Sequence, residues 1–174
     1  MSQIKSIKCT NCAAPLNLLG GGRVQSITCS YCKSLLDLND NYKVLTNFKS
    51  IKEKHKLPFH IGMKGELNGI EYTIIGRITY AAVDYPYGEW TDFLLFSALY
   101  GYAYLTYEEG HLIYSKRNRT FPNLTWLETM HSSTLYIDDT PYLPFDEYQA
   151  KVIYVEGELT WIAKHNDKVY LIDL

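Results

Sequence analysis

The sequence lacks long apolar runs and has few cysteines. No apolar stretch approaches the roughly 20 residues that a helix needs to cross a bilayer, and the amino-terminal MSQIKSIKCT has no apolar centre of the kind found in signal peptides. The four cysteines all lie between positions 9 and 32. These features predict a cytoplasmic protein without a transmembrane segment. The cytoplasm is a reducing compartment, so we do not expect disulfide bonds between the cysteines.

Residue groupings typical of catalysis are missing as well. The triglycine at 20–22 is followed by Arg23, so it lacks the lysine and hydroxyl residues of a phosphate-binding P-loop. The five histidines show no metal-ligand spacing, and adjacent acids such as Asp138 and Asp139 would point to opposite faces of a strand. We therefore predict no catalytic residue and favour a protein that is not an enzyme, without excluding one.

Sustained helical periodicity is also absent: no segment keeps it over twelve residues. From residue 59 onward, short β-type runs alternate with turns, as in IEYTIIGRITY, WTDFLLF and YGYAYLTY, and EEG (108–110) predicts a hairpin turn into HLIYSK. YQAKVIYV, ELTWIAKH and KVYLIDL predict three further strands. The expected fold is mainly β, with a small four-cysteine zinc ribbon followed by an antiparallel β-barrel or sandwich-like domain.

The cysteines form two Cys-x-x-Cys pairs, Cys9 with Cys12 and Cys29 with Cys32, separated by sixteen residues. Four thiolates complete the tetrahedral coordination of one zinc ion, and this spacing is typical of a zinc ribbon. We expect one structural Zn²⁺, with the segment between the pairs folded as a hairpin whose tip is the triglycine at 20–22. A closed four-thiolate site leaves no position for water or substrate, so this zinc would not be catalytic. Iron in a rubredoxin-like site is the remaining alternative.

Charge is unevenly distributed along the chain. Residues 1–60 carry nine Lys or Arg and three acids, a net charge of +6, whereas residues 61–174 carry eight Lys or Arg and sixteen acids, a net charge of −8. Such a step is typical of two modules with different partners, or of two modules that dock on each other.

These patterns predict three parts of the chain. Residues 1–42 form the zinc ribbon, residues 43–58 a basic linker that holds a short helix capped by Thr46 or Asn47, and residues 59–174 the antiparallel β domain. The expected core of the β domain comprises Leu94, Tyr104, Leu105, Ile113, Val155, Trp161 and Ile162.

Two groups of side chains are candidate binding surfaces. Tyr100, Tyr102 and Tyr104 occupy alternate positions of one strand and are expected on one face of the sheet, where they serve either cross-strand packing or stacking on a ligand. His111, directly after the EEG turn, is a further candidate. The linker supplies a basic group: Lys43, Lys49, Lys52, Lys54 and Lys56.

The stretch FHIGMKGELNGIEYTIIGRITY, followed by EWTDFLLF, GYAYLTYEEGH and VEGELTW, resembles a bacterial family known only as domain of unknown function 4178. The resemblance covers roughly residues 59–174, and an amino-terminal zinc ribbon is common in similar proteins. The chain departs from the family at Leu112, where tryptophan is frequent, and its end leaves open whether it is native or truncated. The matching motifs fall at Gly62, Gly65, Gly69, Gly76-Arg77, Trp90–Leu95, Gly101-Tyr102 and Gly110-His111.

This resemblance implies a β fold and no assigned reaction, so no catalytic residue is carried over. Similar proteins accompany membrane-stress and polyamine-related systems, which implies an accessory role. Our preferred interpretation is a non-catalytic zinc-ribbon adaptor that binds protein. One alternative is a nucleic-acid-binding protein that uses the ribbon and the lysine-rich linker, and another is a ligand-binding or enzymatic β-barrel with a tyrosine-lined cavity.

Overall fold

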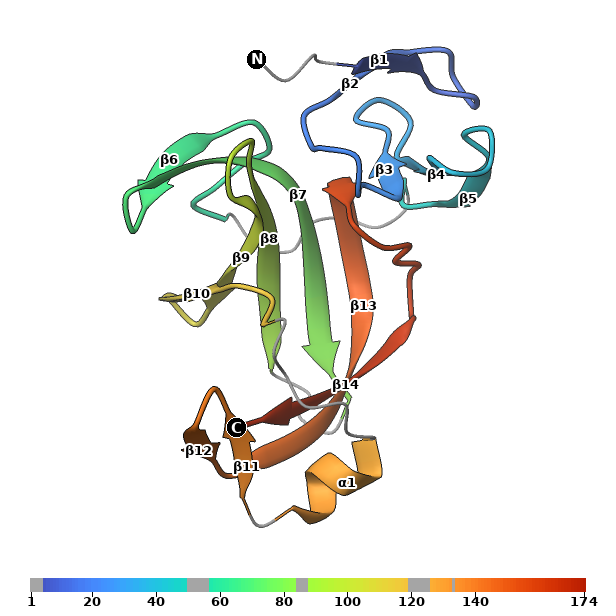
Figure 1. Ribbon diagram of the computed structural model, residues 1–174. Coiled ribbons are helices and arrows are strands. Elements are labelled where there is room, and N and C mark those ends of the chain that lie inside the picture. The colour runs from blue at the N-terminus through green and yellow to red at the C-terminus, as the bar shows by residue number, and fades with distance from the viewer. Residues whose placement is uncertain (1–4, 50–56, 84–87, 119–125, 133) are drawn as a thin grey trace.

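The computed structural model describes residues 5–49, 57–83, 88–118, 126–132 and 134–174. Strands make up most of these residues, which confirms the mainly β fold, and one short helix follows the tenth strand (Figure 1). In chain order the elements are β1 (Lys5–Lys8), β2 (Pro15–Leu18), β3 (Ser26–Thr28), β4 (Ser34–Asp37), β5 (Val44–Asn47), β6 (Lys64–Leu67), β7 (Ile70–Ala82), β8 (Glu89–Ser97), β9 (Gly101–Glu108), β10 (His111–Ser115), α1 (Trp126–His131), β11 (Leu135–Ile137), β12 (Thr140–Tyr142), β13 (Asp146–Leu159) and β14 (Lys168–Asp173).

A ten-stranded antiparallel sheet runs through the molecule. Its order is β10-β9-β8-β7-β13-β3-β4-β5, with β14 paired to β13 and β6 paired to β7. The end strands β10 and β5 do not pair with each other in the described part of the chain, so the sheet is not closed into a barrel. The two-stranded sheets β1-β2 and β11-β12 lie near opposite ends of the long strands β7 and β13 (Figure 1).

Both faces of the central strands are covered. In β8, Phe93 and Leu95 pack into one buried cluster with Ile74, while Leu94 packs into a second cluster with Ile78. Successive rather than alternate residues are therefore apolar, which explains the uninterrupted run FLLF. A third, smaller cluster surrounds the cysteines.

Two glycines bring β13 unusually close to β7. Gly76 and Gly157 are cross-strand partners, and a Cβ atom on Gly76 would lie 1.8 Å from the Glu158 carbonyl oxygen. Gly157 has a φ of 73°, in the left-handed region that favours glycine. Gly157 also pairs with Thr28 of β3, so β13 leaves β7 at this point and continues the sheet into the four-cysteine region.

Six of the seven predicted core residues are buried or partly buried. Leu94, Leu105 and Val155 are buried, and the partly buried Tyr104, Trp161 and Ile162 pack against the cluster that contains Leu94 and Ile78. The prediction for Ile113 is wrong: its side chain is 54% exposed. The reason is that β10 is the last strand of the sheet and has a neighbour on one side only.

Two local predictions also differ from the structure, and a third is not tested. Thr46 and Asn47 lie in β5, and residues 50–56, where the predicted linker helix would lie, are outside the described residues, so that helix stays a prediction. ELTWIAKH contributes only its first two residues to a strand, the end of β13. The segment between the cysteine pairs is not one hairpin, because β2 pairs with β1 and β3 pairs with β4.

Candidate metal centre and the adjoining cleft

Each Cys-x-x-Cys pair forms the turn of its own hairpin. In the first turn the Cys9 N–H donates to the Ala14 carbonyl (2.9 Å), and the Ala13 N–H donates to the Cys9 carbonyl (2.8 Å). In the second turn the Cys29 N–H donates to the Ser34 carbonyl (2.8 Å), and the Lys33 N–H donates to the Cys29 carbonyl (2.9 Å). The residue after each second cysteine has a positive φ, 60° at Ala13 and 59° at Lys33. The two turns are therefore built alike, although their sequences share little beyond the cysteines.

The four Sγ atoms converge on one point. All lie within 4.8 Å of one another, and the Cys9–Cys32 and Cys12–Cys29 Sγ pairs are each 3.7 Å apart. Four sulfurs bound to one zinc ion at about 2.3 Å would be about 3.8 Å apart. None of the four is in a disulfide. The donor set and its spacing therefore fit a tetrahedral thiolate-binding metal ion.

A buried hydroxyl supports one of the sulfurs. Ser34 Oγ accepts hydrogen bonds from the side-chain amides of Asn11 and Asn47, both at 3.0 Å, and lies 3.3 Å from Cys32 Sγ. Because Ser34 already accepts two N–H groups, its own proton is free to donate to a Cys32 thiolate. Hydrogen bonds of this kind orient metal ligands. Neither Ser34 nor the two asparagines was predicted, because the Cys-x-x-Cys spacing does not reveal them.

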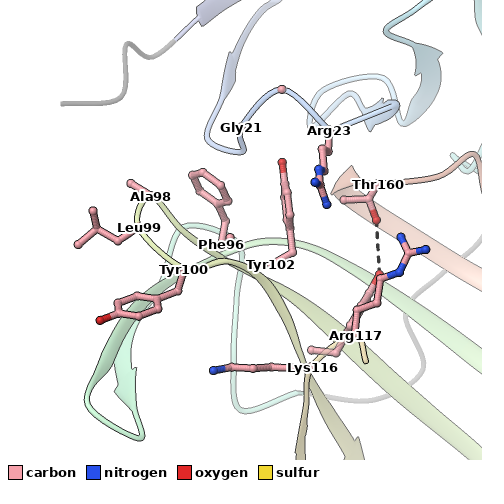
Figure 2. A pocket seen from close by; sticks show the side chains of 13 residues that line it. Gly21, Arg23, Phe96, Ala98, Leu99, Tyr100, Tyr102, Lys116, Arg117 and Thr160 are labelled. Carbon is pink, nitrogen blue, oxygen red and sulfur yellow. Dashed lines mark hydrogen bonds between the residues drawn. The ribbon is translucent and has the colours of Figure 1, made fainter. Parts of the chain in front are cut away.

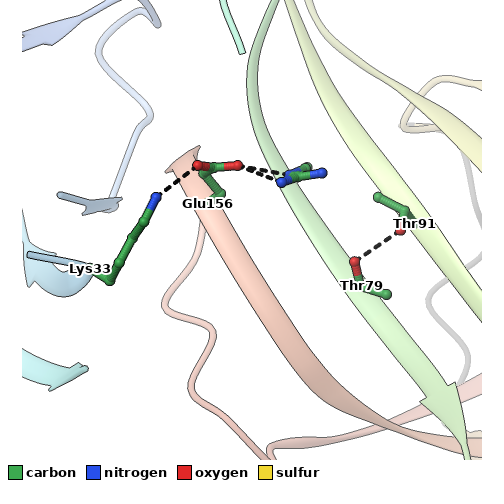
Figure 3. Close-up of polar contacts among 5 residues, drawn as sticks. Lys33, Thr79, Thr91 and Glu156 are labelled. Carbon is green, nitrogen blue, oxygen red and sulfur yellow. Dashed lines mark hydrogen bonds and ion pairs between the residues drawn. The ribbon is translucent and has the colours of Figure 1, made fainter. Parts of the chain in front are cut away.

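An ion-pair chain joins the second cysteine turn to the sheet (Figure 3). Glu156 of β13 lies between Lys33 Nζ, at 3.1 Å, and the Arg77 guanidinium, whose Nη2 is 2.7 Å away. Burial opposes ionisation of Glu156, but Arg77 and Lys33 outweigh it and hold its pKa below the usual carboxyl value. This chain is a contact between the basic amino-terminal part and the acidic β part, of the kind that the charge step suggested.

A second carboxylate holds the loop between β2 and β3, residues 19–25, which we call the triglycine loop. Glu158 is buried and accepts the backbone N–H groups of Leu19 and Gly20, one on each oxygen. Burial raises its pKa, and the two N–H groups oppose this shift. Gly20 fits tightly, because a Cβ atom there would lie 2.6 Å from Val24 and 2.9 Å from Ile75.

A cleft of about 680 Å³ lies where the triglycine loop faces β8 and β9 (Figure 2). Tyr100, Tyr102 and Tyr104 all line it, so the structure brings the three predicted tyrosines together. Tyr102 and Tyr104 lie in β9 and pack against the core, whereas Tyr100 lies in the preceding turn and is 64% exposed. Burial raises the pKa of Tyr102, and the nearby backbone N–H groups of Arg23 and Gly21 oppose this shift.

The other predicted surface residues lie elsewhere. His111 is exposed at the start of β10, opposite Glu108, and does not line the cleft. Lys49 is exposed after β5, and Lys43 lies 3.8 Å from Asp40 in an exposed pair. The remaining linker lysines lie outside the described residues: Lys52, Lys54 and Lys56.

Asp92, a partly buried acid within the β domain, was not singled out from the sequence. Asp92 lies on β8, accepts a 2.6 Å hydrogen bond from Thr106 Oγ1 and has a pKa raised by burial. The signal was present in WTDFLLF, because an acid between apolar residues of a strand covered on both faces must point inward. A half-buried carboxylate of this kind affects stability, and it does not line the cleft.

Comparisons with known proteins identify one family. Among the described residues, no helix is both long and apolar enough to span a membrane. A search of the curated proteins and a search of the solved structures each returned no match. A family model, described as "Domain of unknown function (DUF4178)", matches residues 60–174. The match begins between β5 and β6 and runs through β14. The chain therefore belongs to the DUF4178 family, as the motifs between Gly62 and His111 suggested.

Proposed function

We propose that the four cysteines bind one zinc ion and that this ion is structural. Sulfur spacing supports the proposal, because the Cys9–Cys32 and Cys12–Cys29 separations of 3.7 Å are close to those of a tetrahedral set of thiolates. Metal binding would supply stability that the small cluster around the cysteines cannot, since such sites contribute on the order of 10 kcal/mol to folding. A cytoplasmic location is part of this proposal, because four cysteines that bind zinc as thiolates must stay reduced.

Elemental analysis of purified protein tests the metal. We expect one zinc per chain, and loss of this zinc when Cys12 is replaced by serine. Ser30→Ala is a matched control, because Ser30 is an exposed residue within the second turn that offers no thiolate. Stoichiometric iron, or zinc retained in full by the Cys12→Ser protein, would contradict the proposal.

We further propose that the chain is a non-catalytic adaptor that binds another protein through the free edge of β10. The supporting observation is that Leu112 and Ile113, on opposite faces of this strand, are 52% and 54% exposed. In the described part of the chain, no strand pairs with the outer edge of β10. Exposed apolar edge strands are templates for pairing with another chain, and proteins usually protect them.

The direction of the free backbone groups follows from the hairpin. Glu109 and Gly110 form a two-residue turn with φ values of 47° and 87°, and His111 pairs with Glu108. Hydrogen bonds between the residues flanking such a turn make the N–H groups of His111 and Ile113 point toward β9. The Leu112 N–H therefore points outward and is available to a partner strand.

A photo-crosslinking residue at position 112 of the full chain, expressed in the native host, tests this proposal. We expect a defined protein adduct at position 112 and no such adduct from the same residue at Tyr136, which is exposed on β11. Leu112→Pro, which removes the outward N–H and leaves the bonds to β9, should weaken binding of the identified partner. Equal adducts at both positions, or unchanged affinity of the Leu112→Pro protein, would contradict it.

A further inference from the structure

The cleft beside the triglycine loop is lined by cations as well as by aromatic rings. Arg23 reaches it from the loop, and Lys116 and Arg117 reach it from the segment after β10 (Figure 2). None of the described residues that line the cleft is acidic. This is unusual for its surroundings, because residues 61–174 carry twice as many acids as basic residues.

The three cations are all exposed. No ion pair joins Arg23, Lys116 or Arg117 to an acid within the part of the chain that the structure describes. Lys116 Nζ lies 5.6 Å from the centre of the Tyr114 ring, a contact that leaves its charge intact. The cleft therefore presents three positive charges to whatever enters it.

The remaining walls suit a flat ring. Phe96 and Tyr102 pack together with ring centres 5.1 Å apart, and Tyr100 stands at the rim with most of its surface exposed. Aromatic side chains beside cations are the combination that holds nucleobases and their phosphates. A volume of about 680 Å³ falls in the range of about 300–1,000 Å³ that is typical of small-molecule sites.

We propose that this cleft binds a nucleoside monophosphate or a similar compact phosphate ester that carries a planar ring. A phosphate ester with a charge of about −2 matches the three cations better than a single carboxylate does. An extended polynucleotide fits less well, because residues 61–174, which supply most of the cleft, carry a net charge of −8 that would repel its further phosphates. Arg23 lies outside residues 60–174, so the site needs both parts of the chain.

Calorimetric titration of the zinc-loaded full chain with adenosine and uridine monophosphates tests the proposal. We expect saturable binding of at least one of them, with inorganic phosphate and the free nucleosides binding at least about tenfold more weakly, because each supplies half of the contacts. Lys116→Gln and Arg117→Gln should each raise the Kd about tenfold. Lys151→Gln removes an exposed cation of β13 that lies far along the sheet from the cleft, and it should leave the Kd unchanged.

Several outcomes would overturn the proposal. They are the absence of saturable binding by both nucleotides, nucleotide binding that the Lys116 and Arg117 variants do not alter, and tighter binding of a single-stranded oligonucleotide that depends on the same cations. An exposed apolar side chain beside the cleft would also suit a membrane surface, and Leu99 is 89% exposed next to Tyr100. The phosphate of a lipid headgroup is therefore the competing ligand. Binding to anionic vesicles that is lost in Leu99→Ser, with none to soluble nucleotides, would likewise overturn it.

Discussion

The same substitution at two positions of the triglycine loop should have opposite effects. A Cβ atom on Gly20 would meet Val24 at 2.6 Å, Ile75 at 2.9 Å and a Glu158 carboxylate oxygen at 3.0 Å, whereas a Cβ atom on Gly22 would meet nothing within 4 Å. Neither glycine has a positive φ, so alanine is compatible with the backbone at both positions. The contrast therefore depends on packing alone.

Gly20→Ala should destabilise the protein by about 1–3 kcal/mol, the usual cost of overpacking a filled site. Glu158 cannot move away without weakening its bonds to the N–H groups of Leu19 and Gly20. Gly22→Ala should stabilise it by about 0.4–1 kcal/mol, because alanine restricts the unfolded chain and costs nothing in the folded one. The two variants should thus differ by about 1.4–4 kcal/mol.

Urea unfolding followed by tryptophan fluorescence, at one fixed concentration of free zinc, measures this difference. With a urea m-value of about 2 kcal/mol per molar, the midpoints should differ by roughly 0.7–2 M and the m-values should agree. The fixed zinc concentration matters, because bound metal adds to the apparent stability of both variants. If Gly20→Ala unfolds at the same urea concentration as Gly22→Ala, the triglycine loop does not dock on Glu158 as described.

Three further changes test other parts of the structure. Asp92→Asn should stabilise the protein at neutral pH. Burial raises the Asp92 pKa, so wild-type stability falls as the pH rises above the ordinary value of 3.8. The variant still accepts the Thr106 hydroxyl, and its urea midpoints measured against pH should lack this fall. Ala13→Gly should stabilise the zinc-bound form by about 1 kcal/mol, because glycine adopts the positive φ without strain; a lower melting temperature would refute this. Glu156→Gln should destabilise the protein by about 1–3 kcal/mol, because it removes the carboxylate that pairs with both the Arg77 guanidinium and Lys33. In the wild type this contribution is present above the ordinary carboxyl pKa of 4.5 and is lost as the pH falls through the lowered pKa of Glu156, so the two proteins should approach equal stability in acid.

Local patterns in the sequence were enough to predict many of the elements. The strands β7, β8, β9 and β10 follow from alternating or continuous apolar runs of few residues, and the turn between the last two follows from Glu109-Gly110. The convergence of the four cysteines follows from their spacing, since two intervening residues allow both sulfurs of a pair to face one point. Each of these features depends on residues that are neighbours in the chain, which is why the sequence reveals them.

The order of the strands depends on contacts between distant residues. Pairing of β3 with β13 joins Thr28 to Gly157, and no local pattern indicates which strand will continue the sheet into the four-cysteine region. For the same reason β10 was expected to contribute Ile113 to the core, although its position at the end of the sheet leaves that side chain exposed.

The spacing of the cysteines within residues 9–32 determined that this protein has a cluster of four cysteines that could hold a metal ion. Only the tertiary structure decided where that site sits and what lies beside it. It placed Glu156 between Lys33 and Arg77, and it brought Arg23 to the same cleft as Lys116 and Arg117. The physical reason is that a charged side chain in a sequence carries no information about its partners until strand pairing fixes which surfaces meet.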